Sequence, residues 1–225
     1  MRDSFATAAG YWLPSAALVS SRMRRLFGVR ATIARDDAVA LTFDDGPHRE
    51  GTRAILAALE RAHARATFFL VGEQVERLPD VAAEVAAAGH EIGVHCQRHR
   101  NLMRLTPREV RDDLDRATEV IARATGREVR VYRPPYGILT MAAVAYARKA
   151  GWQIVLWRRA GEDWDSRATA ASIAARIVRR LAPGDVILLH DADHYSAKES
   201  WRATADALPL LLRELQRRAL GTAPL

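Results

Sequence analysis

The chain has 225 residues, of which 49% are hydrophobic and 27% are charged, a balance that is ordinary for a globular enzyme. Its net charge is +7, but the 34 basic residues are interleaved with acids and form no dense basic block, which argues against nucleic-acid binding. The single cysteine, Cys96, excludes an intramolecular disulfide, and no apolar run is long enough to span a bilayer.

The beginning of the chain is expected to be a helical appendage, residues 1–35, ahead of one catalytic domain over 36–218 and a C-terminal tail over 219–225. The stretch 8–19 is mildly apolar but contains Pro14, and its basic residues Arg22, Arg24 and Arg25 follow it. A signal peptide has its basic residues first, so we expect no cleaved signal and a cytoplasmic protein without a transmembrane segment. A helix lying on a membrane surface is the alternative, which leaves peripheral membrane contact open.

Short β-branched or aromatic runs alternate along the chain with longer stretches of helical pattern. The predicted strands are 39–43, 67–71, 91–95, 129–133, 153–157 and 186–190. The predicted helices are 52–62, 80–88, 107–124, 141–150, 170–181 and 201–218. Glycines stand between a helix and the next strand, where helices commonly end, at Gly89, Gly126, Gly151 and Gly184. This alternation predicts a parallel α/β sheet or barrel.

Two adjacent carboxylates, Asp44 and Asp45, follow the first predicted strand and lead into Gly46. Such a pair is unfavourable unless a cation or a proton resolves the repulsion. Further along, His95 and His99 form a pair four residues apart. One carboxylate and two imidazoles make a three-ligand metal site with room for water, and the second carboxylate can serve as a base. Taken alone, the Asp-Asp-Gly motif also fits an ordinary turn. The histidine pair, taken alone, also fits two neighbouring residues on a helix surface.

Other polar residues stand at the ends of the remaining strands. Arg133 ends the fourth predicted strand, Asp163 follows the fifth by a short loop, and His190 ends the sixth. The carboxyl ends of parallel strands form one face of an α/β fold, so these residues are predicted to meet the carboxylates and histidines there. The pattern indicates metal-assisted hydrolysis.

These ordered motifs resemble the polysaccharide deacetylase family, carbohydrate esterase family four, whose homology domain also occurs in chitooligosaccharide deacetylases. The family's TFDDG motif is similar to residues 42–46, its H[ST]xxH motif to 95–99, its RxPY motif to 133–136, and its LxHD motif to 188–191. The DxxDW motif survives as Asp163-Trp164. The resemblance covers about residues 36–218. It implies a distorted (β/α) barrel of about seven strands with its active site at the C-terminal strand ends.

The resemblance also implies roles for residues. Asp45, His95 and His99 would hold a divalent metal, zinc first, with cobalt or nickel able to substitute. Asp44 would be the general base, with a second metal ligand as its alternative role, and His190 the general acid.

Supporting roles follow from the same resemblance. Arg133 would pair with Asp44 and keep it ionised, and Asp163 would fix the tautomer of His190 and raise its pKa. Tyr136 would offer a backbone N–H to the developing oxyanion. Trp164 and Leu188 would form the wall of the acetyl pocket, with packing in the core as their alternative role. The candidates for the outer cleft are His48, His194, Tyr195 and Trp201.

The chain departs from the family pattern at two places. Cys96 stands where the family has Ser or Thr, which suggests a looser loop or a more oxidation-sensitive site. Ala160 stands where the fourth motif has its first Asp, and we expect activity to survive because Asp163 is retained. The neighbouring Arg158 and Arg159 suggest altered substrate contacts.

The function implied is metal-dependent hydrolysis of an N-acetyl group on an N-acetylated amino sugar, a glycan or an oligosaccharide. Two alternatives remain within enzymes, an O-acetyl esterase and a deacylase of a small glycoside or nucleotide sugar. A third is a non-catalytic glycan-binding module, against which the retained Asp44, Asp45 and His190 count.

Overall fold

The computed structural model describes residues 20–225. A curled parallel sheet forms its centre, with the strand order β1-β6-β5-β4-β3-β2-β8-β7 and β9 paired to β2. The strands are β1 (Val29–Arg30), β2 (Ala38–Asp44), β3 (Ala66–Leu70), β4 (Glu91–Val94), β5 (Val131–Tyr132), β6 (Gln153–Val155), β7 (Arg159–Ala160), β8 (Val186–His190) and β9 (Gly221–Thr222). The six predicted strands are present, and β1, β7 and β9 were not predicted.

The two ends of the sheet approach each other beside β8. The N–H of Ile33, just after β1, donates to the carbonyl of Gly184 at 2.8 Å, and Val186 donates to Ala31 at 3.3 Å. The chain between β6 and β7 also reaches β8, because Arg158 donates to the carbonyl of Val186 at 3.0 Å. These bonds join the edges of the sheet, and the expected distorted (β/α) barrel is confirmed.

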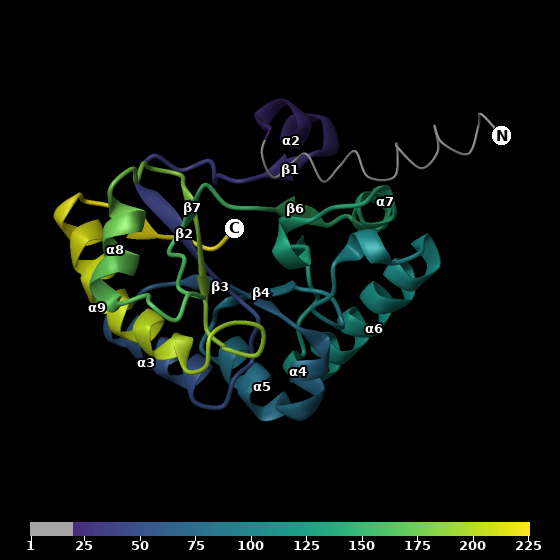
Figure 1. Cartoon of the computed structure of the whole chain (residues 1–225), viewed down its shortest axis with the longest axis horizontal. Helices are drawn as coiled ribbons and strands as arrows, with labels where there is room; N and C mark the ends of the chain where they lie inside the picture. Colours follow the sequence, from purple (N-terminus) through teal and green to yellow (C-terminus); the bar gives the residue numbers. More distant parts are fainter. Residues whose placement is uncertain (1–19) are drawn as a thin grey trace.

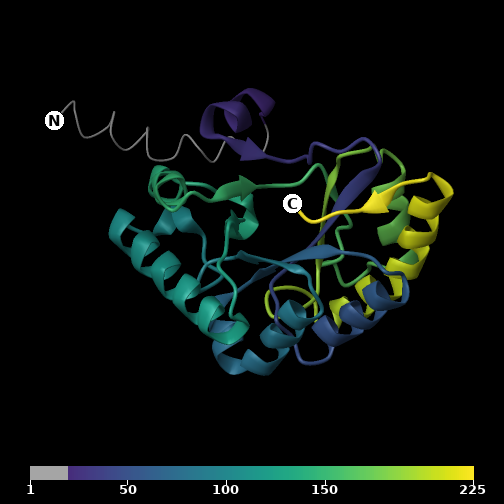
Figure 2. The same ribbon diagram turned by 180° about the vertical axis from the view of Figure 1, so that it is seen from behind.

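Helices cover the outside of this barrel. Figure 1 shows α8, α9, α3, α5, α4, α6 and α7 in an arc around the strands, with α2 beside β1 on the other side, and Figure 2 shows the same arc from behind. Their bounds are α2 (Ser21–Phe27), α3 (Gly51–Arg61), α4 (Gly72–Arg77), α5 (Pro79–Ala87), α6 (Pro107–Thr125), α7 (Met141–Lys149), α8 (Ala170–Val178) and α9 (Ser200–Arg217). All six predicted helices are present, and α2 and α4 are not among them.

Helix ends follow local chemistry. Thr106 and Glu109 form a reciprocal capping box at the start of α6, and Gly126 ends that helix with a φ of 65°. Only a residue that tolerates the left-handed region ends a helix this way, and glycine does so without a Cβ clash. No helix among residues 20–225 is both long and apolar enough to cross a bilayer.

Alternation along each strand sorts side chains into two cores. In β2, Leu41 and Phe43 face outward and join the large core under the helices. A smaller cluster fills the barrel: Ala40, Phe69, Val131, Val155 and Val186. Because successive side chains of a strand point to opposite faces, Thr42 and Asp44 share the inner face with Ala40. The strands therefore place polar groups at one end of an apolar interior.

Segments near both ends of the described chain, residues 20–225, take part in the barrel. β1 pairs with β6, and β9 pairs with β2, so parts of the expected appendage and tail take part in the sheet. Leu225 packs against the inner cluster. The domain limits 1–35, 36–218 and 219–225 stay predictions, and the apolar stretch at 8–19 lies outside the described residues.

Candidate active site

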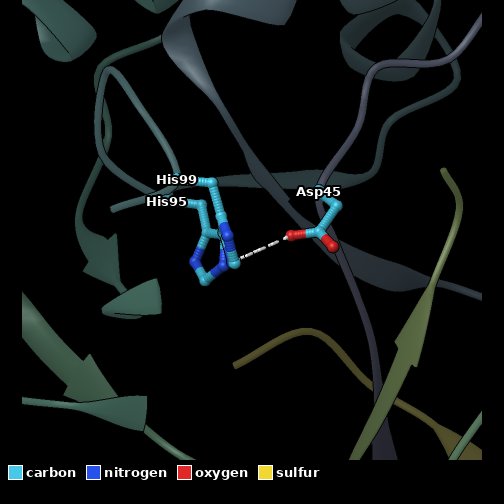
Figure 3. A group of neighbouring side chains, drawn as sticks. All are labelled: Asp45, His95 and His99. Atoms are coloured by element: carbon cyan, nitrogen blue, oxygen red, sulfur yellow. Dashed lines mark ion pairs between the residues drawn. The ribbon is translucent and has the colours of Figure 1, made fainter. Parts of the chain in front are cut away.

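Three side chains from two loops meet at the C-terminal end of the strands. Asp45 follows β2, and His95 and His99 follow β4. The Oδ1 atom of Asp45 lies 3.5 Å from Nε2 of His95 and 3.4 Å from Nε2 of His99. Figure 3 shows both imidazoles side by side, facing the carboxylate. Among the described residues, these three form the group whose ligand atoms lie close enough together to hold a metal ion.

The arrangement fits a tetrahedral ion. Zinc bonds to nitrogen and oxygen are about 2.0–2.2 Å long, which places neighbouring ligand atoms of a tetrahedron about 3.4 Å apart. The two measured separations match this spacing. The Oδ1 atom of Asp45 is buried and has no hydrogen-bond partner among the described residues, a state that a cation would relieve. Burial also lowers the pKa of both histidines to about 3, so both imidazoles are neutral and able to ligate.

Asp44 has a different environment from Asp45. Its Oδ1 atom accepts a hydrogen bond from Nη1 of Arg133 at 2.7 Å, and Arg133 also donates to Oγ1 of Thr42. Arg133 is fully buried, and its guanidinium stacks 4.2 Å above the ring of Phe69 inside the barrel. Burial raises the pKa of Asp44, and the ion pair with Arg133 only opposes that rise. The predicted pairing is present, but it does not lower the pKa of this carboxyl.

His190 ends β8 on the other side of the cavity. Its Nδ1 lies 2.9 Å from Oδ1 of Asp163, and its backbone N–H donates to Oδ2 of the same carboxylate. Thr204 of α9 also donates to Asp163, at 2.8 Å. Burial would lower the pKa of His190, but Asp163, Asp45 and Asp44 together raise it to about 10. The Nε2 atom is left facing Asp45, 4.0 Å from its Oδ2.

A cavity of about 500 Å³ joins these groups. All the residues predicted for the acetyl pocket and the oxyanion line it, namely Tyr136, Trp164 and Leu188. Trp164 meets the ring of His190 edge-on at 5.6 Å and is 40% exposed, so it is a wall of the cavity and not part of the core. Trp157, Tyr195 and Ser196 line it as well.

Four non-glycine residues around the cavity have a left-handed backbone. They are Asp45 (φ 79°), Cys96 (φ 66°), Tyr136 (φ 59°) and Glu162 (φ 52°), and each is, or directly adjoins, a predicted site residue. Side chains with a Cβ rarely adopt such angles, which cost about 1–3 kcal/mol each, and they cluster where a fold must aim a functional group.

Several minor expectations come out differently. Arg158 and Arg159 do not line the cavity, because both pair with the buried carboxylate of Asp185. Of the outer-cleft candidates, Tyr195 lines the cavity, whereas His48 packs between His194 and Trp201 away from it.

The two departures from the family pattern leave the geometry intact. Cys96 is fully buried with its Sγ atom 3.6 Å from the hydroxyl of Tyr132, and burial raises the pKa of its thiol. A buried, protonated thiol reacts slowly with oxidants, which argues against the expected sensitivity. Ala160 lies in β7 opposite Leu188, and Asp163 contacts His190 without the missing acid.

Sequence reasoning missed Thr204, Trp157 and Thr42. Thr204 is a single polar residue on a helix whose pattern gives no sign of its contact with Asp163. Trp157 is the last residue of the predicted strand 153–157. Because the site lies at the C-terminal ends of the strands, this position could have identified Trp157 as a site residue.

Comparisons with known proteins agree with this geometry. The polysaccharide deacetylase family profile matches residues 32–155. The chain is 34% identical over 210 residues to a chitooligosaccharide deacetylase of Bradyrhizobium sp., covering 89% of this chain and 95% of that protein. It is 37% identical over 152 residues to a peptidoglycan-N-acetylglucosamine deacetylase of Bacillus cereus, covering 68% of this chain and 55% of that protein. The alignment thus spans just over half the length of this second relative.

The fold is also similar to solved structures. The crystal structure of the Bc1960 peptidoglycan N-acetylglucosamine deacetylase, in complex with 4-naphthalen-1-yl-N-oxidanyl-benzamide, superposes with a TM-score of 0.85 at 29% identity. The match covers 92% of this chain and 95% of that one. Sequence, fold and site lead to one conclusion: the chain belongs to the polysaccharide deacetylase family and is a hydrolase of that family.

Proposed function

We propose that the protein is a metal-dependent deacetylase that removes the N-acetyl group from an N-acetylated amino sugar in a glycan or oligosaccharide. Asp45, His95 and His99 hold the ion, with zinc first and cobalt or nickel as substitutes. When bound, the ion supplies Lewis-acid polarisation of the acetyl carbonyl and acidifies water. One observation carries the proposal. Oδ1 of Asp45 lies 3.5 Å from Nε2 of His95 and 3.4 Å from Nε2 of His99, which is the spacing between neighbouring ligand atoms of a tetrahedral zinc ion.

Asp44 is the general base in this proposal. Its Oδ1 is held by Arg133, while Oδ2 lies 3.9 Å from Nε2 of His95, beside the three ligands but farther away than Asp45. Burial raises the pKa of Asp44, which strengthens it as a proton acceptor, and the ion pair with Arg133 opposes that rise. The ion pair also supports the base role over the second-ligand role, because it already occupies one oxygen.

His190 is the general acid. The hydrogen bond from Nδ1 to Asp163 leaves the proton on Nε2 facing the cavity, and the raised pKa of about 10 keeps His190 protonated in the resting protein. It can therefore protonate the departing amine nitrogen, while Asp163 fixes the ring. The base and the acid stand on opposite sides of the same cavity, as hydrolysis of an amide requires.

The acetyl group is proposed to enter beside Leu188 and Trp164, whose apolar surfaces suit a methyl group. The backbone N–H of Tyr136 is the proposed donor to the oxyanion. Tyr136 is 53% exposed, so its ring stands at the mouth of the cavity, where a sugar would arrive.

The relatives named above support an N-acetylated glycan as substrate, because they are a chitooligosaccharide deacetylase and a peptidoglycan-N-acetylglucosamine deacetylase. An O-acetyl esterase is the second candidate, since a water deprotonated by Asp44 would attack the carbonyl of an acetyl ester as it attacks that of an acetyl amide. A cytoplasmic location and peripheral membrane contact stay predictions.

Acetate release separates these candidates. The zinc-loaded protein is expected to release acetate from N-acetylchitooligosaccharides faster than from acetylated xylan or small acetyl esters, and to stop after chelation. Faster release from the esters would favour the esterase. Tight glycan binding without acetate release would favour a binding module, and full activity in metal-free protein would overturn the proposed mechanism.

A further inference from the structure

The two histidines of the candidate metal site differ in what fixes their rings. Nδ1 of His95 lies 2.7 Å from the carbonyl of Arg133, and this hydrogen bond turns Nε2 toward Asp45. Nδ1 of His99 is buried and has no hydrogen-bond partner among residues 20–225. An imidazole that ligates a metal is normally oriented through its second nitrogen. The orientation of His99 therefore needs another source.

Two aromatic rings contact His99. The ring of Tyr195 stacks on it with centroids 4.4 Å apart and an interplanar angle of 15°. Tyr136 approaches it edge-on at 4.5 Å. Contacts of this kind contribute about 0.5–1.5 kcal/mol each, and they limit rotation of a ring because each has a preferred geometry.

Tyr195 is itself anchored at its far end. Its hydroxyl donates to Oε1 of Glu73 at 2.7 Å and accepts from Nε2 of Gln74 at 3.0 Å, and both partners lie in α4. The anchor ties the loop between β8 and α9 to this helix. The proposed reaction assigns no role to the ring or to the hydroxyl of Tyr195.

The same helix supports the histidine loop directly. The backbone N–H groups of Gly72 and Glu73, at the start of α4, donate to the carbonyls of Cys96 and Gln97, each at 2.9 Å. Space is tight here, since a Cβ on Gly72 would lie 2.0 Å from Oε1 of Gln97. The start of α4 thus holds both the backbone around His99 and the residue that stacks on its ring.

We propose that Tyr195 is a positioning residue for the metal ligand His99. Its ring, anchored on α4, takes the place of the hydrogen bond that Nδ1 of His99 lacks. The inference rests on the proposed metal site and extends it with a residue that is neither a ligand nor part of the acid–base machinery.

Zinc affinity tests the proposal without any measurement of catalysis. The dissociation constant is measured by competition with a chromogenic chelator for the parent, Tyr195→Leu and Tyr195→Phe. Loss of an orienting partner weakens metal binding by about 10–100-fold, and we expect Tyr195→Leu to fall in this range. Tyr195→Phe keeps the ring and loses only the anchor, so its dissociation constant should rise less.

A matched control is Tyr146→Leu. Tyr146 also combines a hydroxyl contact, to Asp115, with an aromatic contact, to Trp152, but it lies on α7 outside the cavity. This variant should bind zinc like the parent. Unfolding temperatures in the presence of chelator show whether each variant is folded, and Tyr195 lies half-buried in the loop before α9.

Two results would overturn the inference. One is a folded Tyr195→Leu protein that binds zinc as tightly as the parent. The other is equal weakening in Tyr195→Phe and Tyr195→Leu, which would assign the effect to the hydroxyl and not to the stacked ring. A parent protein that binds no zinc would instead overturn the proposed metal site itself, so the two failures are distinguishable.

Discussion

At the scale of single residues, the cavity holds carboxylates and imidazoles whose pKa values are moved by opposing influences. Burial raises the pKa of Asp44 against the pull of Arg133, whereas Asp163 raises the pKa of His190 against burial. The two shifts suit the proposed roles, because a raised pKa makes Asp44 a better proton acceptor and makes His190 hold its proton more tightly. Two titratable groups whose environments differ in this way can serve as the base and the acid of one site.

Replacing Asp163 by Asn should lower the pKa of His190. Without the carboxylate, burial is left as the main influence and favours the neutral imidazole. The basic limb of the kcat/KM profile, where the acid loses its proton, should move to lower pH by about one unit or more, together with a fall in kcat.

The control is Asp165→Asn, because Asp165 pairs with Arg167 and not with His190. Its pH profile should match that of the parent. An unchanged basic limb in Asp163→Asn would show that Asp163 does not set the protonation of His190.

Cys96→Ser tests whether the thiol takes part in the chemistry. Because Cys96 is buried, protonated and turned toward Tyr132, it can act neither as a nucleophile nor as a ligand. The variant should keep most of the acetate release, and brief peroxide treatment should affect parent and variant alike. A folded Cys96→Ser protein without activity would show that the thiol is required.

At the scale of elements, the site depends on how each strand ends. The chain turns through a left-handed residue at Asp45 after β2 and at Cys96 after β4. These turns place Asp45 and His99 beside Asp44, the last residue of β2, and His95, the first residue after β4. Close packing beneath the turns keeps them in place.

Gly93 in β4 shows how close that packing is. A Cβ at this position would lie 2.5 Å from Cδ1 of Phe69 and 2.9 Å from Cγ2 of Val131. The added methyl group of Gly93→Ala would displace the ring of Phe69, on which the guanidinium of Arg133 stacks. We expect the substitution to lower the free energy of unfolding by about 1–3 kcal/mol. Urea unfolding measures this loss.

Gly221→Ala is the matched control, since its Cβ would meet no atom closer than 3.7 Å. Its stability should stay within about 0.5 kcal/mol of the parent. If Gly93→Ala were as stable as the parent, Phe69 and Val131 would be able to move without cost, which would contradict the prediction.

Much at this scale was predictable from sequence, for identifiable reasons. The long strands β2 and β8 carry apolar runs, and α6 has its capping box and terminal glycine, so local signals agree with the fold. β1, β7 and β9 have two residues each and exist because a neighbouring strand pairs with them, which no local pattern records. The helix α4 follows β3 directly and has only six residues, too few for a periodic signal.

The site divides in the same way. Asp44, Asp45, His95 and His99 stand in short motifs that the sequence shows directly. Thr204, by contrast, reaches Asp163 from an element distant in sequence, and only the folded chain brings them together. The stacking of Tyr195 on His99 is of the same kind.

At the scale of the whole molecule, the two ends of the barrel have different tasks. The C-terminal strand ends hold the candidate site, while the opposite end contains buried polar groups that lie outside it. His90 is one of them. Its Nδ1 accepts a hydrogen bond from the N–H of Ala66 at 3.3 Å, and its ring packs on Phe68 at 5.3 Å.

His90 should make the fold sensitive to acid. Burial lowers its pKa from 6.5 to about 4, so below pH 6.5 the unfolded chain binds a proton that the folded chain does not. The free energy of unfolding is therefore unaffected by the protonation of this residue above pH 6.5. It falls by on the order of 2 kcal/mol as the pH drops toward 4, because protons then favour the unfolded chain. His90→Asn keeps an acceptor for Ala66 and should remove this part of the loss.

Urea unfolding at pH 7 and pH 4.5, with chelator present, compares the two proteins. His63→Asn is the control for the exchange of a histidine for an asparagine, because His63 is exposed. An equal loss in the parent and in His90→Asn would contradict the assignment to His90.

The central claim is that adjacent aspartates divide the work, with Asp45 as metal ligand and Asp44 as base. The most direct test is the zinc-to-protein ratio by elemental analysis, measured side by side for the parent, Asp44→Asn and Asp45→Ala after zinc loading and dialysis. We predict one zinc per chain in the parent and in Asp44→Asn, although Asp44→Asn should lose about 10²–10⁴-fold in turnover. Asp45→Ala should be largely empty. An empty Asp44→Asn protein beside a fully loaded Asp45→Ala protein would contradict the account and exchange the two roles.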